Sequence, residues 1–447
     1  MRRWSLILAT LLGLATVGLL AVPQAGAAGH GKIHSKLWVS NSAPLAVAPG
    51  TSCAHPGYST IQSAINVAGN FGATIEVCAG TYTEQLTMTQ SVALKGSGAV
   101  TVKLPASPGN STTSCDNAIG AASPFQQPQD AISICGASVS ITGITVSAFW
   151  PAGMCYDSLY GVLVGAGGNL TANGLTVNGA GVPIGDSAVG CQGGVAIQVG
   201  SARPAINEAG TATLKNTVVS GYQKNGITTT GTGSVLTVDG ASVTGRGPVG
   251  TAENGIEVAY GAKGTITHAN VSANICLLPG TCGPNGLTQT EATGVLFYGA
   301  ATGSSLQSSA ISGNDIGVYY GSTSPTEPGS PEVAITKNTF TSNPDEQIQL
   351  DQGVATVNDN KLKGSGNVGI EVLQYGVPNG QSYAPASTAT KDTISGQGVG
   401  VEVLSDNAVS GDFPGTFTIS ASKFLTGNTV ATQDNSTNYT IHQVGDR

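Results

Sequence analysis

The sequence contains little charge. Of its 447 residues, 17 are Lys or Arg and 25 are Asp or Glu, which gives a formal net charge of −8. This negative balance disfavours nucleic acid and anionic membranes as partners, because both are recognised through basic patches. Low charge also argues against disorder, since disordered segments combine high charge with few β-branched residues. The composition instead suits strands joined by tight turns, for which the chain has 64 glycines.

Long hydrophobic runs are absent after the first 22 residues. Two arginines precede an apolar segment at Trp4–Val22, and small residues follow at Ala25–Ala28. These are the parts of an export signal, so residues 1–28 are expected to be a cleaved signal peptide, with a membrane anchor as the alternative. The mature protein is therefore expected to be secreted and to have no membrane association.

Cysteine is absent from the last third of the chain, since all eight cysteines precede residue 283. In an exported protein, eight cysteines indicate four disulfides. Zinc is not expected, because no C-x-x-C pair occurs and the five histidines are scattered. The simplest pairing joins neighbours: Cys53–Cys78, Cys115–Cys135, Cys155–Cys191 and Cys276–Cys282.

A glycine followed by alternating apolar residues recurs along the chain about every 30 residues, a period typical of solenoids. The clearest copies are GIEV from Gly369 and GVEV from Gly400. Weaker copies begin at Gly161, Gly194, Gly226, Gly255, Gly294 and Gly317 and, without the glycine, at Gln347. Two more strand-like segments lie between successive copies. Three short strands per repeat predict an all-β, three-sided parallel β-helix of about 10–12 coils.

The N-terminal part departs from this repeat. Apolar residues at helical spacing predict a short helix at 61–68, with Thr60 or Ser59 as its N-cap. Such a helix would cap the first coil, whose core and strand edges are otherwise exposed. The expected organisation is a signal peptide at 1–28, a linker at 29–50, a cap and first coils at 51–104, the β-helix at 105–434 and an edge strand or tail at 435–447.

The start of the solenoid also carries a family resemblance. TIQSAI from Thr60, TIEVCAGTYTEQL from Thr74 and VALKGSG from Val92 are similar to the opening of pectin-lyase-like right-handed parallel β-helix proteins. Pectinesterases and many bacterial surface proteins share this opening. The resemblance implies a single-stranded right-handed β-helix in a secreted bacterial protein, and an active groove, where one exists, on an outer strand face. It does not specify an activity.

Side chains alternate between the two faces of a strand, so one polar residue in each copy is expected on the outer face. Glu371 and Glu402 should lie on adjacent coils about 5 Å apart, the carboxylate separation of retaining glycosidases. A solvated outer face, on which these carboxylates only aid solubility, is the alternative. The aligned outer positions are Leu163, Thr228, Glu257, Leu296, Tyr319, Gln349, Glu371 and Glu402.

Three functions remain open for this face. The leading hypothesis is a secreted protein that interacts with extracellular or cell-wall carbohydrate. The second is a divergent polysaccharide lyase or glycoside hydrolase with Glu371 and Glu402 as catalytic candidates, and the third is a structural or adhesive solenoid. No cofactor is expected, although calcium is an alternative ligand of the carboxylates. The ligand-binding candidates are Tyr319, Gln349, Glu257, Trp150 and Tyr156.

Motifs of the known enzymes with this fold are missing. Polygalacturonase-like, pectinesterase-like and alginate-epimerase-like signatures do not occur, so no catalytic motif is recognisable. Lyases use an Arg or Lys base, and the mid-chain candidates are Arg203, Arg246, Lys224 and Lys263. Asparagines that precede the main strand are expected to be structural, at turns or in stacked ladders. They are Asn225, Asn254, Asn314, Asn343 and Asn367.

Overall fold

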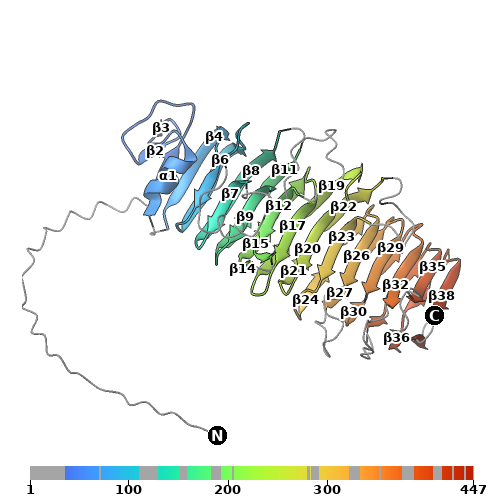
Figure 1. Ribbon diagram of the computed structural model, residues 1–447. Coiled ribbons are helices and arrows are strands. Elements are labelled where there is room, and N and C mark those ends of the chain that lie inside the picture. Colours follow the sequence, from blue (N-terminus) through green and yellow to red (C-terminus); the bar gives the residue numbers. More distant parts are fainter. Residues whose placement is uncertain are drawn as a thin grey trace, which may run out of the picture. The chain divides into compact units, whose positions relative to one another are not determined.

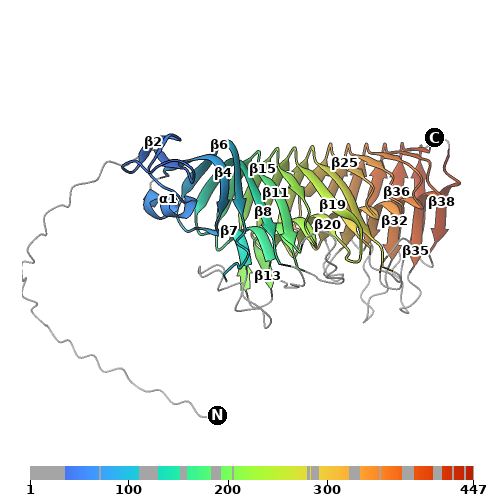
Figure 2. The ribbon, with the colours of Figure 1, turned by 90° about the horizontal axis from the view of Figure 1, so that it is seen from above.

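Most described segments of the chain are β-strands that pair in parallel with the strand one coil away (Figure 1). The computed structural model describes residues 36–69, 72–109, 129–151, 159–182, 193–203, 206–278, 282, 291–321, 333–351, 354–374, 387–405, 415–424, 427–436 and 439–445. Within these residues the parallel strands form two sheets, of 12 and 23 strands. Figure 2 shows the coils stacked one behind another.

The 12-stranded sheet receives one strand from each coil, and its strands follow chain order. The repeated segments that stand out in the sequence form β9 to β35 of this sheet. Its strands are β5 (Leu86–Met88), β7 (Gln129–Cys135), β9 (Leu159–Gly165), β12 (Val195–Val199), β17 (Asn225–Thr230), β20 (Asn254–Ala259), β23 (Thr293–Tyr298), β26 (Ile316–Gly321), β29 (Glu346–Asp351), β32 (Val368–Gln374), β35 (Val399–Ser405) and β38 (Val430–Asn435).

The 23-stranded sheet receives two strands from most coils, which gives the predicted three strands per coil. Near the N-terminus, β4, β6 and β8 are longer strands. The sheet comprises β1 (Lys36–Val39), β4 (Thr74–Thr83), β6 (Val92–Lys103), β8 (Ser138–Phe149), β10 (Asn169–Asn173), β11 (Thr176–Gly181), β15 (Thr211–Lys215), β16 (Val218–Ser220), β18 (Val235–Asp239), β19 (Ser242–Val249), β21 (Lys263–Thr267), β22 (Asn270–Cys276), β24 (Ser304–Gln307), β25 (Ala310–Ser312), β27 (Val333–Thr336), β28 (Thr339–Thr341), β30 (Ala355–Asn358), β31 (Lys361–Lys363), β33 (Thr388–Thr390), β34 (Thr393–Ser395), β36 (Gly415–Ser420), β37 (Lys423–Phe424) and β39 (Tyr439–Val444). Two short antiparallel pairs complete the described strands: β2 (Gly50–Ser52) with β3 (His55–Pro56), and β13 (Ser201–Arg203) with β14 (Ile206–Glu208).

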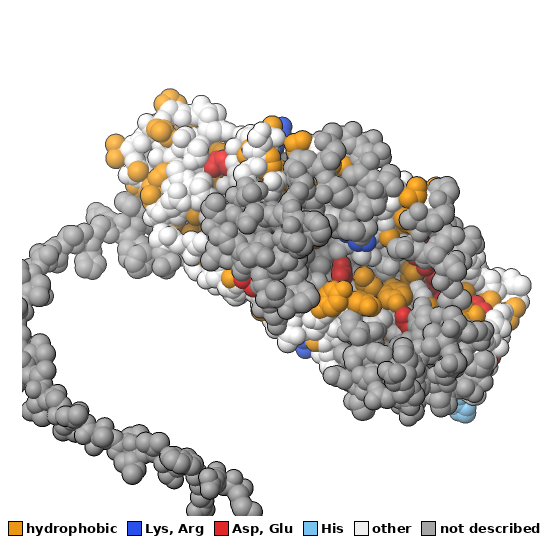
Figure 3. Space-filling model, viewed as in Figure 1, with side chains coloured by type: hydrophobic (Ala, Val, Ile, Leu, Met, Phe, Trp, Pro, Cys, Tyr) orange, Lys and Arg blue, Asp and Glu red, His pale blue; other side chains and the backbone are white. Residues whose placement is uncertain are grey.

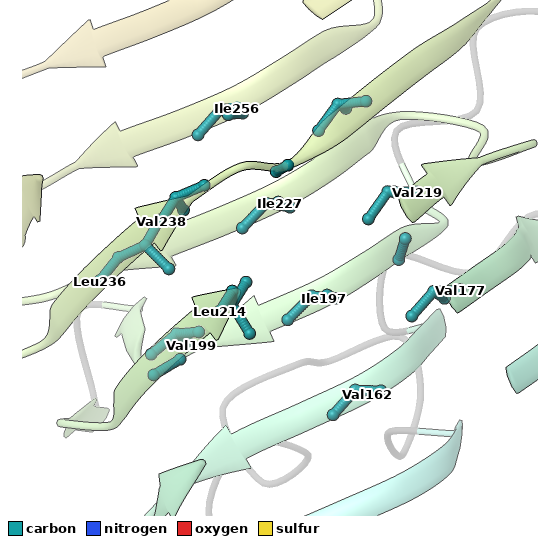
Figure 4. Close-up of a cluster of buried hydrophobic side chains, with 14 of the residues drawn as sticks. Val162, Val177, Ile197, Val199, Leu214, Val219, Ile227, Leu236, Val238 and Ile256 are labelled. Atoms are coloured by element: carbon teal, nitrogen blue, oxygen red, sulfur yellow. The ribbon is translucent and has the colours of Figure 1, made fainter. Parts of the chain in front are cut away.

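Stacked aliphatic side chains fill the interior of the coils. Ile197, Ile227 and Ile256 are paired residues of β12, β17 and β20, and all three are fully buried. Figure 4 shows them packed with Leu214 and Leu236 of the other sheet. Burial of each such side chain contributes roughly 1.5–3 kcal/mol. Because the isoleucines must stay inside, the residue after each one is held on the outer face.

The capping helix α1 spans Ile61–Ala68, as the sequence predicts. Thr60 is its N-cap, since its side chain accepts a hydrogen bond from the Ser63 amide at 3.2 Å, so the alternative Ser59 was wrong. Two amides of the first turn donate to the Glu84 carboxylate, each at 3.0 Å, where the helix dipole also favours a negative charge. In the described part of the chain no helix is long and apolar enough to cross a membrane.

Both ends of the solenoid contain strands. Residues 29–50 do not form a linker throughout, because Lys36–Val39 is β1 and pairs in parallel with β4. Leu37 of this strand is buried against the cap. The strand was not predicted, because it has only four residues and no repeated copy in the sequence. Within residues 435–447, β39 pairs in parallel with β36 and forms an edge strand.

Two of the four expected disulfides join described residues. Cys53–Cys78 links the segment between β2 and β3 to β4, and Cys276–Cys282 closes a short loop after β22. Cys135 is also disulfide-bonded. Its expected partner Cys115, and the expected pair Cys155–Cys191, lie outside the described residues.

Buried amide side chains connect successive coils in ladders. The Asn360 side-chain oxygen accepts hydrogen bonds from the backbone amide of Asn338 at 2.9 Å and from its side chain at 3.1 Å. Asp392 accepts the equivalent pair from Asn360, at 2.8 and 2.9 Å. Each side chain thus accepts hydrogen bonds from buried amides in the turn of the coil before it. Without these acceptors the buried amides would be unpaired and would destabilise the fold.

The expected asparagines are only partly in such ladders. Asn314 and Asn343 are fully buried and bonded to each other at 3.2 Å. Asn254 donates to Asn225 at 3.0 Å on the 12-stranded sheet. Asn367 is exposed and makes only a long contact of 3.4 Å to Asp345. The ladder through Asn338 and Asn360 was not among the expectations, because those asparagines do not precede the main strand.

Replacing Asn360 tests the ladder. Asn360→Ala removes the acceptor of two buried donors, so we expect a loss of about 2–3 kcal/mol in the free energy of unfolding. Asn358→Ala, two residues away and half-buried, is the matched control and should change stability by less than about 0.5 kcal/mol. Denaturant unfolding measures both. Equal destabilisation by the two substitutions would contradict the ladder's role.

Candidate functional site on the 12-stranded sheet

The outer row of the 12-stranded sheet has the register that the sequence predicts. Thr228 pairs with Glu257, Tyr319 with Gln349, and Glu371 with Glu402. The row, which we call the outer row, also contains Gln198 and Gln433, which the repeat pattern does not predict. Its members from β9 to β38 are Leu163, Gln198, Thr228, Glu257, Leu296, Tyr319, Gln349, Glu371, Glu402 and Gln433.

The outer row is not a solvated surface near its carboxylates. Glu371 is 7% exposed, Glu402 8% and Gln349 8%. The alternative in which these carboxylates only aid solubility is therefore wrong at these positions, since solubility requires exposed charge. Burial of polar groups on an outer face must instead be offset by hydrogen bonds, by protonation or by a bound ligand.

Five carboxyl groups gather over β29, β32 and β35, with Glu291 as a further acidic neighbour, and we call the five the carboxyl cluster. Burial raises the pKa of Glu346 and of Glu371, and repulsion from neighbouring carboxylates raises both further. Burial likewise raises the pKa of Asp345 and of Asp351, each to about 7. The fifth member is Glu402, whose pKa burial also raises. The cluster therefore retains protons near neutral pH.

Hydrogen bonds distinguish the two catalytic candidates. Glu402 accepts from the side-chain amides of Asn435 at 2.8 Å and Gln433 at 3.2 Å, and the bond from Asn435 opposes the rise in its pKa. For Glu371 every contribution to the pKa is a raising one, with repulsion from Glu402 the largest after burial. The two neighbours therefore differ in environment, the arrangement that separates an acid from a base in enzymes.

Tyr319 connects the row to Asp351. Its hydroxyl donates to Asp351 Oδ2 at 2.7 Å, which opposes the effect of burial on the pKa of that carboxyl. Among the described residues, the other oxygen of Asp351 and single oxygens of Glu346 and Gln349 are buried without a hydrogen-bond partner. Such oxygens are unsatisfied acceptors, and a ligand's hydroxyl group would reach them once the groups that cover them move aside.

A second group lies at the other end of the row, around β20 and β23. The rings of Tyr260 and Tyr298 meet edge to face at 5.6 Å, and Tyr260 is 50% exposed. Glu257 lies beside them, accepts from the Asn225 amide and raises the pKa of Tyr260. We call Glu257, Tyr260 and Tyr298 the tyrosine group. Figure 3 shows hydrophobic, acidic and basic side chains together in the middle of this face.

Two of the basic residues considered as lyase bases are engaged near the start of β17 and β20, away from Tyr260, which follows the end of β20. Arg246 donates to the carbonyls of Gly221 and Val182, both at 2.7 Å. Lys224 donates to a backbone carbonyl, and burial lowers its pKa against the opposing charges of Glu257 and Glu253. Arg246 is therefore held by the backbone. Of the other two candidates, Lys263 is exposed and the Arg203 side chain lies outside the described set.

Of the predicted aromatic candidates, Tyr319 lies in the outer row, whereas Trp150 does not. Trp150 is 1% exposed, and its ring nitrogen donates to Gln129 at 2.9 Å, so it fills the core and offers no sugar platform. Tyr156 lies outside the described residues. The pairing of Tyr260 with Tyr298 was not predicted from the sequence. Tyr260 lies in the turn after its strand, where the alternation of side chains does not predict which way a residue points.

In the described ranges, no group of three or more His, Cys, Asp or Glu residues is placed to hold a metal ion. A shallow pocket on the 23-stranded sheet is lined by small residues of β6, β8 and β10, among them Val92, Ser140 and Thr171. It contains none of the predicted site residues.

The raised pKa values predict that the protein is more stable in mild acid. The folded chain holds protons on Asp345 and Asp351 up to about pH 7. The unfolded chain releases them near pH 4, so unfolding releases protons and stability falls as pH rises between about 4 and 7. Melting temperatures at pH 5 and pH 8 measure this.

Glu346→Gln is the variant that tests the cause. It removes a carboxyl group that stays protonated in the folded chain at pH 8 but ionises on unfolding, and we expect the melting temperature at pH 8 to rise toward that at pH 5. Asp359→Asn, at an exposed carboxylate, is the control and should leave the pH dependence unchanged. A wild-type protein that is more stable at pH 8 than at pH 5 would contradict the assignment.

Comparisons with known proteins agree with the architecture. Residues 205–380 match the family model described as right handed beta helix region. No curated protein has significant sequence similarity to the chain. XylC in complex with xylose is 10% identical with a TM-score of 0.54, over 91% of this chain and 86% of that chain.

Two further solved structures are similar. The A-module of the Azotobacter vinelandii mannuronan C-5 epimerase AlgE6 is 14% identical, with a TM-score of 0.50 over 87% of this chain and 94% of that chain. The catalytic domain of a GH87 α-1,3-glucanase in complex with nigerose is 12% identical, with a TM-score of 0.51 over 86% of this chain and 66% of that chain. At these identities the likeness is one of fold. With its stacked parallel strands, the chain has the right-handed parallel β-helix fold.

Proposed function

We propose that the protein binds a polysaccharide along the outer face of its 12-stranded sheet, between β17 and β35. The observation that supports this most directly is the outer row, which presents one side chain per coil in unbroken register. A linear polysaccharide presents the same groups at each sugar unit. An evenly spaced row of mostly polar side chains can therefore contact successive sugars of the polymer.

The two ends of the row supply complementary contacts. Tyr260 and Tyr298 offer an exposed aromatic surface for the apolar face of a sugar ring. The unpartnered oxygens of Glu346, Gln349 and Asp351 offer acceptors for hydroxyl groups at the other end. An apolar surface with a few placed polar groups is the usual composition of a small-molecule site.

The fold relatives support the same substrate class. They are XylC in complex with xylose, a mannuronan epimerase and a glucanase in complex with nigerose. The two disulfides between described residues suit an oxidising compartment, and the expected export signal suits secretion. We therefore propose an extracellular or cell-wall carbohydrate as the partner, with neither nucleic acid nor a membrane at this acidic face.

Truncating a tyrosine tests carbohydrate binding. Tyr260→Ala removes half of the exposed aromatic pair, and we expect affinity for the bound polysaccharide to fall about threefold to tenfold. Tyr260→Phe keeps the ring and should bind like the wild type. Affinity electrophoresis against xylan, α-1,3-glucan, alginate and pectin identifies the polymer. Retained folding without affinity for any polysaccharide would favour the structural or adhesive alternative.

Glycoside hydrolysis is the second candidate function, and the pairing of Glu371 with Glu402 favours it. Adjacent strands lie about 4.8 Å apart, close to the roughly 5–5.5 Å between the carboxyls of retaining glycosidases. Glu371, whose pKa is raised, would donate its proton to the glycosidic oxygen while a Glu402 oxygen bonds the anomeric carbon. Water would then release the sugar from Glu402, with Glu371 accepting the water's proton, so that anomeric configuration is retained.

A turnover assay tests this second function. New reducing ends and unsaturated uronides would be followed on the same polysaccharides, and Glu371→Gln should abolish the first signal while leaving stability near wild type. The rate should fall as pH rises through the raised pKa of Glu371, because the acid loses its proton. Asp392→Asn makes the same chemical change at a buried ladder position and should keep activity. Activity that survives Glu371→Gln would contradict the assignment.

A further inference from the structure

All five lysines after residue 300 lie on the 23-stranded sheet or at its turns, on the last coils of the solenoid. Every one of them is exposed. We call this group the lysine ridge, and its members are Lys337, Lys361, Lys363, Lys391 and Lys423. The overall negative charge of the chain conceals this concentration, because the lysines are spaced far apart in the sequence.

The register places the lysines at a regular interval along the coil axis. Lys361 of β31 pairs with Thr393 of β34, which pairs with Lys423 of β37. Lys361 and Lys423 are therefore two coils apart, about 9.6 Å at the usual strand spacing. Lys337 and Lys391 occupy equivalent turn positions before β28 and β34, with φ of 58° and 60°, and are also two coils apart.

The charge of the ridge is not neutralised by its surroundings. None of the ion pairs between described residues includes these lysines. Asp359 is the exposed carboxylate among them, at the turn between the coils of Lys337 and Lys391. Asp392, next to Lys391, is buried in the ladder with Asn360. Glu346 and the rest of the carboxyl cluster belong to the 12-stranded sheet of the same coils.

In the strands, the groups between the lysines are hydroxyls, whereas in the turns Asp359 lies between Lys337 and Lys391. Thr393 separates Lys361 from Lys423, and Thr339 precedes Lys361 in the same row. Both threonines are half-buried, with their neighbours Thr341 and Ser395 in the next row. No large hydrophobic side chain is strongly exposed between 333 and 424 in the described ranges. The ridge therefore lacks the apolar groups that insert into membranes and the aromatics that stack on nucleic-acid bases.

We propose that the lysine ridge binds an acidic polysaccharide, a polyuronate that lies along the coil axis. Carboxylates of the polymer would pair with the ammonium groups on alternate coils, and its hydroxyls would bond to the threonines between them. This surface is separate from the outer row, and the inference does not rest on the function proposed there. The carboxyl cluster offers no cation to the same polyanion, which leaves the ridge as the face of complementary charge.

Binding of the full chain to sodium polygalacturonate at low salt tests the proposal. The triple variant Lys361→Gln, Lys391→Gln, Lys423→Gln should weaken binding at least about tenfold. A control variant with the same loss of charge, Lys103→Gln, Lys215→Gln, Lys263→Gln, alters exposed lysines of the earlier coils. It should stay within about twofold of wild type, because those lysines do not share a row. Circular dichroism checks that both variants fold.

Further binding measurements distinguish the lysine ridge from net charge, from a different partner and from the outer row. Binding should be lost at high salt and on the fully methyl-esterified polymer, which carries no carboxylates. Equal weakening in the two triple variants would overturn the proposal, since it would reflect net charge alone. Tighter binding to duplex DNA or to anionic vesicles with the same lysine dependence would overturn it in favour of another partner. Loss of polygalacturonate binding in Tyr260→Ala, with the ridge variant unaffected, would place this polymer on the outer row instead.

Discussion

Both of the charged surfaces depend on the parallel pairing of each coil with the next. The pairing holds equivalent residues in one row, and the buried isoleucines prevent a shift of register, because a one-residue slip would turn them toward solvent. Asn338, Asn360 and Asp392 add a second restraint, since each of their bonds joins one coil to its neighbour. Equivalent residues of successive coils are therefore equally spaced along each row, whether the row contains valines, carboxylates or lysines.

The same geometry explains why the two charged surfaces differ. On the 12-stranded sheet, stacking brings Glu371 against Glu402, and burial makes their charges costly, so protons are retained. On the other sheet, Lys361 and Lys423 are separated by Thr393 and remain exposed. Repulsion between the lysines is therefore weak, whereas repulsion within the carboxyl cluster is strong. One face suits proton transfer or hydroxyl recognition, and the other suits a polyanion.

The two parts of the outer row also differ in how fully their polar groups are hydrogen-bonded. Tyr260 and Tyr298 of the tyrosine group lie at the end of β20 and β23, whereas Lys224 and Arg246 are bonded to backbone carbonyls near the start of β17 and β20. The carboxyl cluster instead holds buried oxygens without partners, as in Asp351, which makes it the more costly part of the face. A ligand whose hydroxyl groups donated hydrogen bonds to these oxygens would therefore stabilise the folded chain.

Local periodicity in the sequence was enough to determine the three-sided parallel β-helix, the capping helix at Ile61–Ala68 and the register of the outer row, because each depends on alternation or spacing within one segment. It did not show that Trp150 lies in the core or that Glu371 is buried, since exposure depends on what packs above a residue. The pairing of Tyr260 with Tyr298 and the gathering of the lysines were likewise decided by tertiary structure. Both bring together residues from different coils, and stacking sets their distances.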